Sequence, residues 1–182
     1  MTGDLAAVLP EIEEIADNQL REKVQQSFRI GLEEGEFDTF TAVPWAPHHT
    51  ETVGEQGFIK HTRDVTLMAI ALADQLVDLR DIPLNRDHLI AGALVHDISK
   101  FFEYSGDSLS EYRTLLEHPH MCIYLLQKAE IPVHIQHIAL SHTPQSSVAP
   151  QTIEAEIVQK ADIIAMEGIF CEATGNITQE SK

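Results

Sequence analysis

Apolar residues recur every three or four positions along most of this chain, and that periodicity limits the fold more than any other feature of the sequence. No segment shows the sustained alternation of apolar and polar residues that a half-buried strand requires. The clearest stripe consists of His61, Val65, Met68, Leu72, Leu76 and Leu79. The pattern predicts an all-α fold, and 182 residues suffice for one domain with a sizeable core.

Glycine, proline and capping residues divide the chain into expected helices. These helices cover residues 11–32, 58–79 and 86–101, a segment opened by His118-Pro119, a short stretch after Pro132, and 151–170. The helix over 86–101 follows Asn85, a good N-cap, and its middle is apolar on nearly all sides. We expect it to be central and buried. Residues 35–57 contain two prolines and are predicted to form a long loop of the kind that often acts as a lid.

Charge and composition exclude several classes of function. The chain has 12 basic and 29 acidic side chains, a net charge of −17, which repels nucleic-acid polymers. No apolar run approaches the roughly 20 residues of a membrane-spanning helix, and the N-terminus does not resemble a targeting peptide. We therefore expect a cytoplasmic protein without a membrane partner. A small anionic substrate remains compatible with this charge, because a metal ion and a lysine can reverse the potential locally.

The sequence contains ten histidines, and six of them lie between His96 and His142. Ligand-type side chains stand on apolar stripes of four expected helices: His61, the pair His96 and Asp97, His118 or His142, and Asp162. A single buried histidine is most often a core residue whose hydrogen bonds are satisfied. For Asp162 the alternative to a metal is an ion pair with Lys160 or Arg63. Independent placement on four helices favours a metal site over coincidence.

The adjacent pair His96 and Asp97 needs a particular geometry. Neighbouring side chains on a helix diverge by roughly 100 degrees, so the two cannot both face one partner helix, but they can straddle an ion at a junction between helices. Imidazole and carboxylate ligands together suit one or two ions of Fe, Mn, Ni, Co, Zn or Mg. Lys100 follows one turn later. It could hold a phosphate oxygen, or it could be a surface lysine at a helix C-terminus.

The ordered motifs resemble the HD-domain superfamily of metal-dependent phosphohydrolases over about residues 58–170. His61 stands in His-Thr-x-x-Val, His96-Asp97 in His-Asp-Ile-Ser-Lys, His118 before proline and His142 before threonine, with Asp162 last. The resemblance implies a first ion held by His61, His96, Asp97 and Asp162. It implies that His118 and His142 hold a second ion, as in the dinuclear members. It also implies an HD domain over 58–172, preceded by an N-terminal helix and lid-like loop over 1–57 and followed by a polar tail over 173–182.

A narrower similarity is to the bacterial HD-domain hydrolases of dinucleoside polyphosphates. Those enzymes usually have glycine soon after the motif at His142-Thr143 and four residues after His118, where this chain has Pro144-Gln145 and Cys122. The Gly-Tyr-Pro signature of cyclic-dinucleotide phosphodiesterases is absent from the sequence.

The family resemblance implies hydrolysis of a phosphate ester or phosphoanhydride in a small phosphorylated metabolite, such as a nucleotide. Hydroxide formed at the metal would attack phosphorus, with Asp97 and Lys100 in catalytic roles. Two alternatives use the same ligands: an HD-fold di-iron oxygenase and a non-catalytic metal or nucleotide sensor. His48 and His49 could close over the site from the loop or be solvated there. The sequence leaves the assembly open, a homodimer included.

Overall fold

A computed structural model of the chain describes residues 4–46, 49–55, 57–105, 108–116 and 118–177. Within these residues α-helices dominate, and the strands are the two-residue pair β1 (Tyr104–Ser105) and β2 (Ser108–Leu109). The prediction of an all-α fold is confirmed. Among the described helices, none is both long and apolar enough to cross a lipid bilayer.

The helices follow one another along the chain with short connections. They are α1 (Leu5–Val8), the 3-10 helix η1 (Pro10–Glu14), α2 (Asn18–Glu34), the 3-10 helix η2 (Phe40–Ala42), α3 (Thr50–Val53), α4 (Phe58–Arg80), α5 (Arg86–Val95), α6 (Lys100–Glu103), α7 (Glu111–Leu115), α8 (His120–Lys128), α9 (Val133–Ser141) and α10 (Ile153–Thr174).

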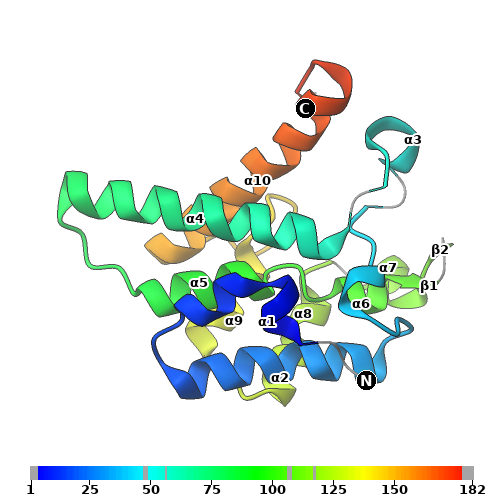
Figure 1. Ribbon diagram of the computed structural model, residues 1–182, viewed down its shortest axis with the longest axis horizontal. Coiled ribbons are helices and arrows are strands. Elements are labelled where there is room, and N and C mark those ends of the chain that lie inside the picture. The colour runs from blue at the N-terminus through cyan, green and yellow to red at the C-terminus, as the bar shows by residue number, and fades with distance from the viewer. Residues whose placement is uncertain (1–3, 47–48, 56, 106–107, 117, 178–182) are drawn as a thin grey trace.

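Helix α5 is the centre of the molecule. It runs between α4 and α2 (Figure 1) and also packs against α9 and α10. Every residue from Leu89 to Val95 is buried, which confirms the expected central helix. Gly92 permits the close approach of α9, because a Cβ at this position would lie 2.6 Å from Cδ1 of Ile138. Helix α10 passes behind α4 in this view and also packs against α5 and α9. The helices α4, α9 and α10, on or next to which His61, His142 and Asp162 lie, therefore all contact α5.

The first helix begins later than the sequence predicted. Residues 11–32 were expected to be one helix, but the chain forms α1 and η1 and then starts α2 at Asn18. The side chain of Asp17 caps α2 by accepting from the Gln19 backbone N–H at 2.8 Å. Asp87, at the start of α5, accepts from the backbone N–H groups of Ala16 and Asp17 at 2.9 Å each. The break between η1 and α2 is thus stabilised by hydrogen bonds to Asp87, a residue far along the chain.

The N-terminal segment shares its core with the central helices. Phe28 of α2 lies at the middle of an aromatic cluster, with ring centroids 5.6 to 6.5 Å apart. The cluster consists of Phe28, Phe40, Phe58 and Phe101. These rings join α2, η2, α4 and α6, so this shared core fixes the end of α4 that carries His61.

The expected loop over 35–57 contains η2 and α3 and is tied to the body of the protein. A bridge joins Pro44 to Gly57, and the Phe58 backbone N–H donates to the Val43 carbonyl at 3.0 Å. Trp45 is buried and its ring stacks on His61 with 4.5 Å between centroids. This part of the loop is therefore packed against the candidate site.

Candidate metal centre

A tight turn follows α5, where the sequence predicted that the helix would continue to residue 101. Helix α5 ends at Val95, and the turn is closed by hydrogen bonds from the backbone N–H of Ile98 to Val95 and of Lys100 to Asp97. These bonds span three residues, which winds the chain more tightly than an α-helix. His96 and Asp97 lie in this turn, and both side chains are buried, with Oδ2 of Asp97 3.9 Å from Nε2 of His96.

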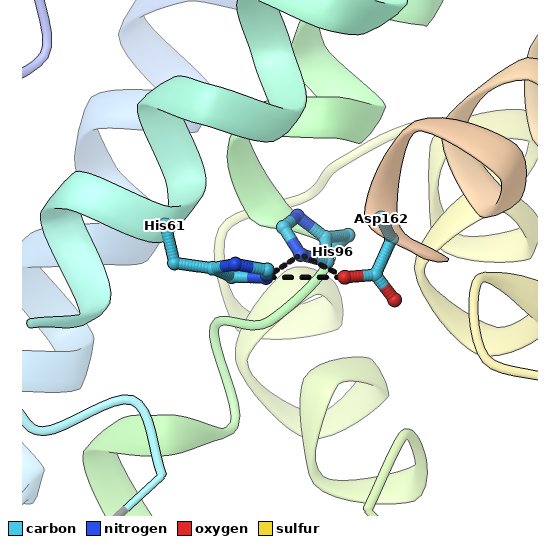
Figure 2. Close-up of side chains that lie close together, drawn as sticks. All are labelled: His61, His96 and Asp162. Carbon is cyan, nitrogen blue, oxygen red and sulfur yellow. Dashed lines mark hydrogen bonds and ion pairs between the residues drawn. The ribbon is translucent and has the colours of Figure 1, made fainter. Parts of the chain in front are cut away.

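Three side chains from three separate segments form a first cluster (Figure 2). His61 comes from α4, His96 from the turn after α5, and Asp162 from α10. The Nε2 atom of His61 lies 3.1 Å from Oδ1 of Asp162 and 3.4 Å from Nε2 of His96. Their ligand atoms could hold a metal ion.

A second cluster lies beside the first and consists of Asp97, His118 and His142. Oδ1 of Asp97 lies 2.6 Å from Nε2 of His118 and 3.4 Å from Nε2 of His142. Its other oxygen, Oδ2, lies 3.7 Å from Nε2 of His61 and 3.9 Å from Nε2 of His96. The carboxylate of Asp97 therefore stands between the two clusters.

Backbone contacts determine which nitrogen of two histidines carries the proton. Nδ1 of His96 lies 2.7 Å from the Ala93 carbonyl oxygen, and Nδ1 of His142 lies 2.6 Å from that of Ala139. Because a carbonyl oxygen only accepts, each Nδ1 donates and each Nε2 directs a lone pair into its cluster. Burial lowers the pKa of His96 to about 4, so its ring stays neutral. Convergent lone pairs and carboxylate oxygens fit a divalent cation.

The structure does not contain the alternative ion pairs considered for Asp162. Arg63 binds Glu11, with Nη2 2.8 Å from Oε1, and Lys160 binds Glu156 at 3.2 Å. Burial raises the pKa of Asp162, but the hydrogen bond from His61 and the electrostatic interactions with His96, His61 and His142 together outweigh burial and lower the pKa. Asp162 is thus held as a carboxylate that faces the histidines.

Lys100 is not a surface lysine at a helix C-terminus, so that interpretation is wrong. It begins α6, only 8% of it is exposed, and its Nζ lies 2.9 Å from Oε2 of Glu103. Burial lowers the pKa of Lys100, but the carboxylates of Asp97 and Glu103 outweigh burial and raise it. The amine is therefore a fixed positive charge beside the second cluster.

Glu103 also belongs to the site, although it was not predicted from the sequence. It is 1% exposed and contacts Ser99, Lys100 and Nδ1 of His118. Burial raises its pKa, but Lys100 and His118 outweigh burial and lower the pKa to about 2. Between its two carboxylate neighbours, His118 has a pKa raised to about 9 although burial and Lys100 lower it. The spacing of three residues between Lys100 and Glu103 could have indicated an ion pair between them. The contact with His118 could not be predicted in this way, because His118 lies in another segment of the chain.

A pocket of about 480 Å³ opens beside the second cluster. Lys100, Arg113 and His118 form part of its wall, and other lining residues are aromatic or apolar. The full lining is Trp45, Ala46, His49, Lys100, Arg113, His118, Pro119, Thr143, Gln145, Met166 and Phe170. His49 is thus at the pocket, with its ring edge-on to Phe170 at 5.2 Å, whereas His48 lies outside the described residues.

The remaining histidines contribute to neither cluster. His88 and His134 approach each other with ring centroids 5.7 Å apart, on α5 and α9. The side chain of His137 accepts a hydrogen bond from the Gln151 backbone at 2.9 Å. These contacts join α5 to α9 and α9 to the segment before α10, and they involve no residue of either cluster.

Residues 58–167 match the family model described as "HD domain", so the chain belongs to the HD domain family. A curated relative is the dihydroneopterin 2',3'-cyclic phosphate phosphodiesterase of Methanocaldococcus jannaschii, 35% identical over 162 residues. The alignment covers 82% of this chain, and the chain spans 64% of the relative's length. No solved structure matches the chain.

Proposed function

We propose that this protein is a metal-dependent phosphohydrolase that cleaves a phosphoester bond in a small phosphorylated metabolite. The observation that carries the proposal is the pair of adjacent three-residue clusters with Asp97 between them. Two ions spanned by one carboxylate are a common arrangement for displacement at phosphorus. Membership of the HD domain family and the relative named as a phosphodiesterase support the same chemistry.

Two ions divide the ligands between them in this proposal. His61, His96 and Asp162 would hold the first ion, and the carboxylate of Asp97 would contribute to it. His118, His142 and Asp97 would hold the second. This mixed set of nitrogen and oxygen ligands suits Fe, Mn, Co, Ni, Zn or Mg. The nearby Cys122 is not counted as a thiolate ligand, because it donates its thiol hydrogen to the His96 carbonyl.

The protein's own side chains orient the substrate. Divalent ions supply Lewis acidity, which activates water and offsets negative charge on the phosphoryl oxygens. Lys100 and Arg113 face the pocket and bind the remaining phosphate oxygens. Four positive charges from two ions exceed the three carboxylates of Asp97, Glu103 and Asp162. The site therefore attracts an anion although the whole chain has a net charge of −17.

The substrate we propose is a phosphodiester, such as a cyclic phosphate, linked to a planar heterocycle. The relative's name specifies a substrate of this kind for that protein. In this chain, the residues that line the pocket include the aromatic side chains of Trp45 and Phe170 and the cationic groups of Lys100 and Arg113. A pocket of about 480 Å³ lies within the size range of small-molecule sites, which fits one heterocycle with its phosphate.

The test is a substrate panel assayed after the apo-protein has been reloaded with Mn, Fe, Co, Ni, Zn or Mg. The panel contains dihydroneopterin and nucleoside 2',3'-cyclic phosphates, phosphomonoesters and dinucleoside polyphosphates. We expect hydrolysis of a cyclic phosphate, and none by Asp97→Ala. Oxygen uptake with a polyol or phosphonate and no ester hydrolysis would identify a di-iron oxygenase instead. Full metal loading without any turnover would favour a sensor.

A further inference from the structure

The carboxylate of Glu103 divides its contacts between its two oxygens, and each oxygen serves a different part of the site. Oε1 accepts from the hydroxyl of Ser99 at 2.5 Å and contacts Nδ1 of His118. Oε2 lies 2.9 Å from Nζ of Lys100 and 3.6 Å from Nε of Arg113. A carboxylate that is 1% exposed is stable only with such partners.

The contact at Oε1 determines how His118 presents its other nitrogen. Because a carboxylate accepts, Nδ1 of His118 donates to Glu103 and Nε2 is directed at Asp97 and His142. Ser99 lies 3.3 Å from the same Nδ1 and is fully buried, so the imidazole ring is held on this side. A carboxylate behind a ligating histidine also raises the basicity of the nitrogen that faces the ion.

The contacts at Oε2 determine where the cationic groups of the pocket lie. Lys100 has a flexible stem, and the bond to Glu103 fixes its amine at the pocket wall. The side chain of Arg113 is 37% exposed and approaches the same oxygen from α7. One carboxylate therefore sets the separation between the second cluster and the two cations.

We propose that Glu103 is a positioning residue that couples His118, as ligand of the second ion, to the phosphate-binding cations Lys100 and Arg113. This inference rests on the proposed function, because it requires a second ion and a phosphate at these places. Glu103 touches neither the ion nor the substrate. It keeps a fixed geometry between them through its two oxygens.

The experiment compares three variants of the full chain by metal titration of the apo-protein and by inhibition with inorganic phosphate. Lys100→Gln should keep both ions and bind phosphate more weakly. His118→Ala should lose the second ion and keep the first. Glu103→Gln retains the shape of the side chain but loses its charge. It should weaken the second ion by roughly 10- to 100-fold, leave the first unchanged, and also weaken phosphate inhibition several-fold.

A matched control is Glu11→Gln, which removes another buried carboxylate. Glu11 is 5% exposed and binds Arg63, outside both clusters. Its replacement should lower stability while both metal affinities and phosphate inhibition stay at wild-type values. A purely structural role of Glu103 predicts the same pattern for Glu103→Gln.

The metal titrations decide whether Glu103 positions His118. If the wild type binds two ions and Glu103→Gln binds both equally well, Glu103 does not position His118 and the inference is wrong. If both ions weaken together, Glu103 acts on the whole fold and the inference is also wrong. A wild type that binds one ion overturns the inference and the dinuclear part of the proposed function together. Wild type with two ions but no hydrolysis overturns only the proposed activity, because the metal titration still tests Glu103.

Discussion

Replacing Gly92 by alanine tests whether the contact between α5 and α9 holds the second cluster in place. The added Cβ would lie 2.6 Å from Cδ1, 2.7 Å from Cγ2 and 3.0 Å from Cβ of Ile138. Rotation of the side chain cannot move the last atom, so the backbone of α9 must shift. Overpacking costs about 1–3 kcal/mol, and the better helix propensity of alanine offsets roughly 0.5–1 kcal/mol of it. We expect a net loss on the order of 1–2 kcal/mol in the free energy of unfolding.

The matched control is Gly168→Ala, on α10, where an added Cβ meets no atom within 4 Å. This variant should gain up to ~1 kcal/mol from helix propensity alone. Urea unfolding of both apo-proteins measures the difference. Because His142 follows Ile138 by one turn of α9, Gly92→Ala should also weaken the second ion more than the first. A Gly92→Ala protein as stable as Gly168→Ala, with unchanged metal affinity, would refute the argument.

Three further predictions concern the metals and the phosphate. An ion present at a hundredfold excess over its Kd stabilises the fold by about 2.7 kcal/mol, so chelation should lower the melting temperature by roughly 5–10 °C for each ion removed. An unchanged melting temperature after verified metal removal would contradict the site. Replacing His118 and His142 together by alanine should leave about one ion per chain by elemental analysis, and an unaltered metal content would exclude the second position. Lys100→Ala should keep its metal but lose roughly 100-fold or more in kcat/KM, and a wild-type rate would remove Lys100 from the reaction.

The residues of both clusters were named from the sequence, partly from apolar helical stripes and partly from the resemblance to the HD-domain superfamily, and the structure brings them together in two groups, whereas their role as metal ligands stays a prediction. A buried polar side chain on such a stripe needs a partner, and the sequence alone shows this for His61, His142 and Asp162. The all-α class and the central position of α5 follow from the same periodicity and are confirmed. Helix boundaries were less accurate where a distant residue decides them, as Asp87 does at the start of α2.

Only the tertiary structure decided how these residues combine. Local spacing favoured a helix through residue 101, whereas in the structure the chain turns at 96–99 and Asp97 lies between both clusters. The burial of Lys100 and the double contact of Glu103 depend on His118 and Arg113, which come from other segments. Periodicity reports which face of a helix is apolar, but it contains no information about which polar groups meet there. That choice is made when the helices pack, because only then do buried charges find partners that offset their loss of water.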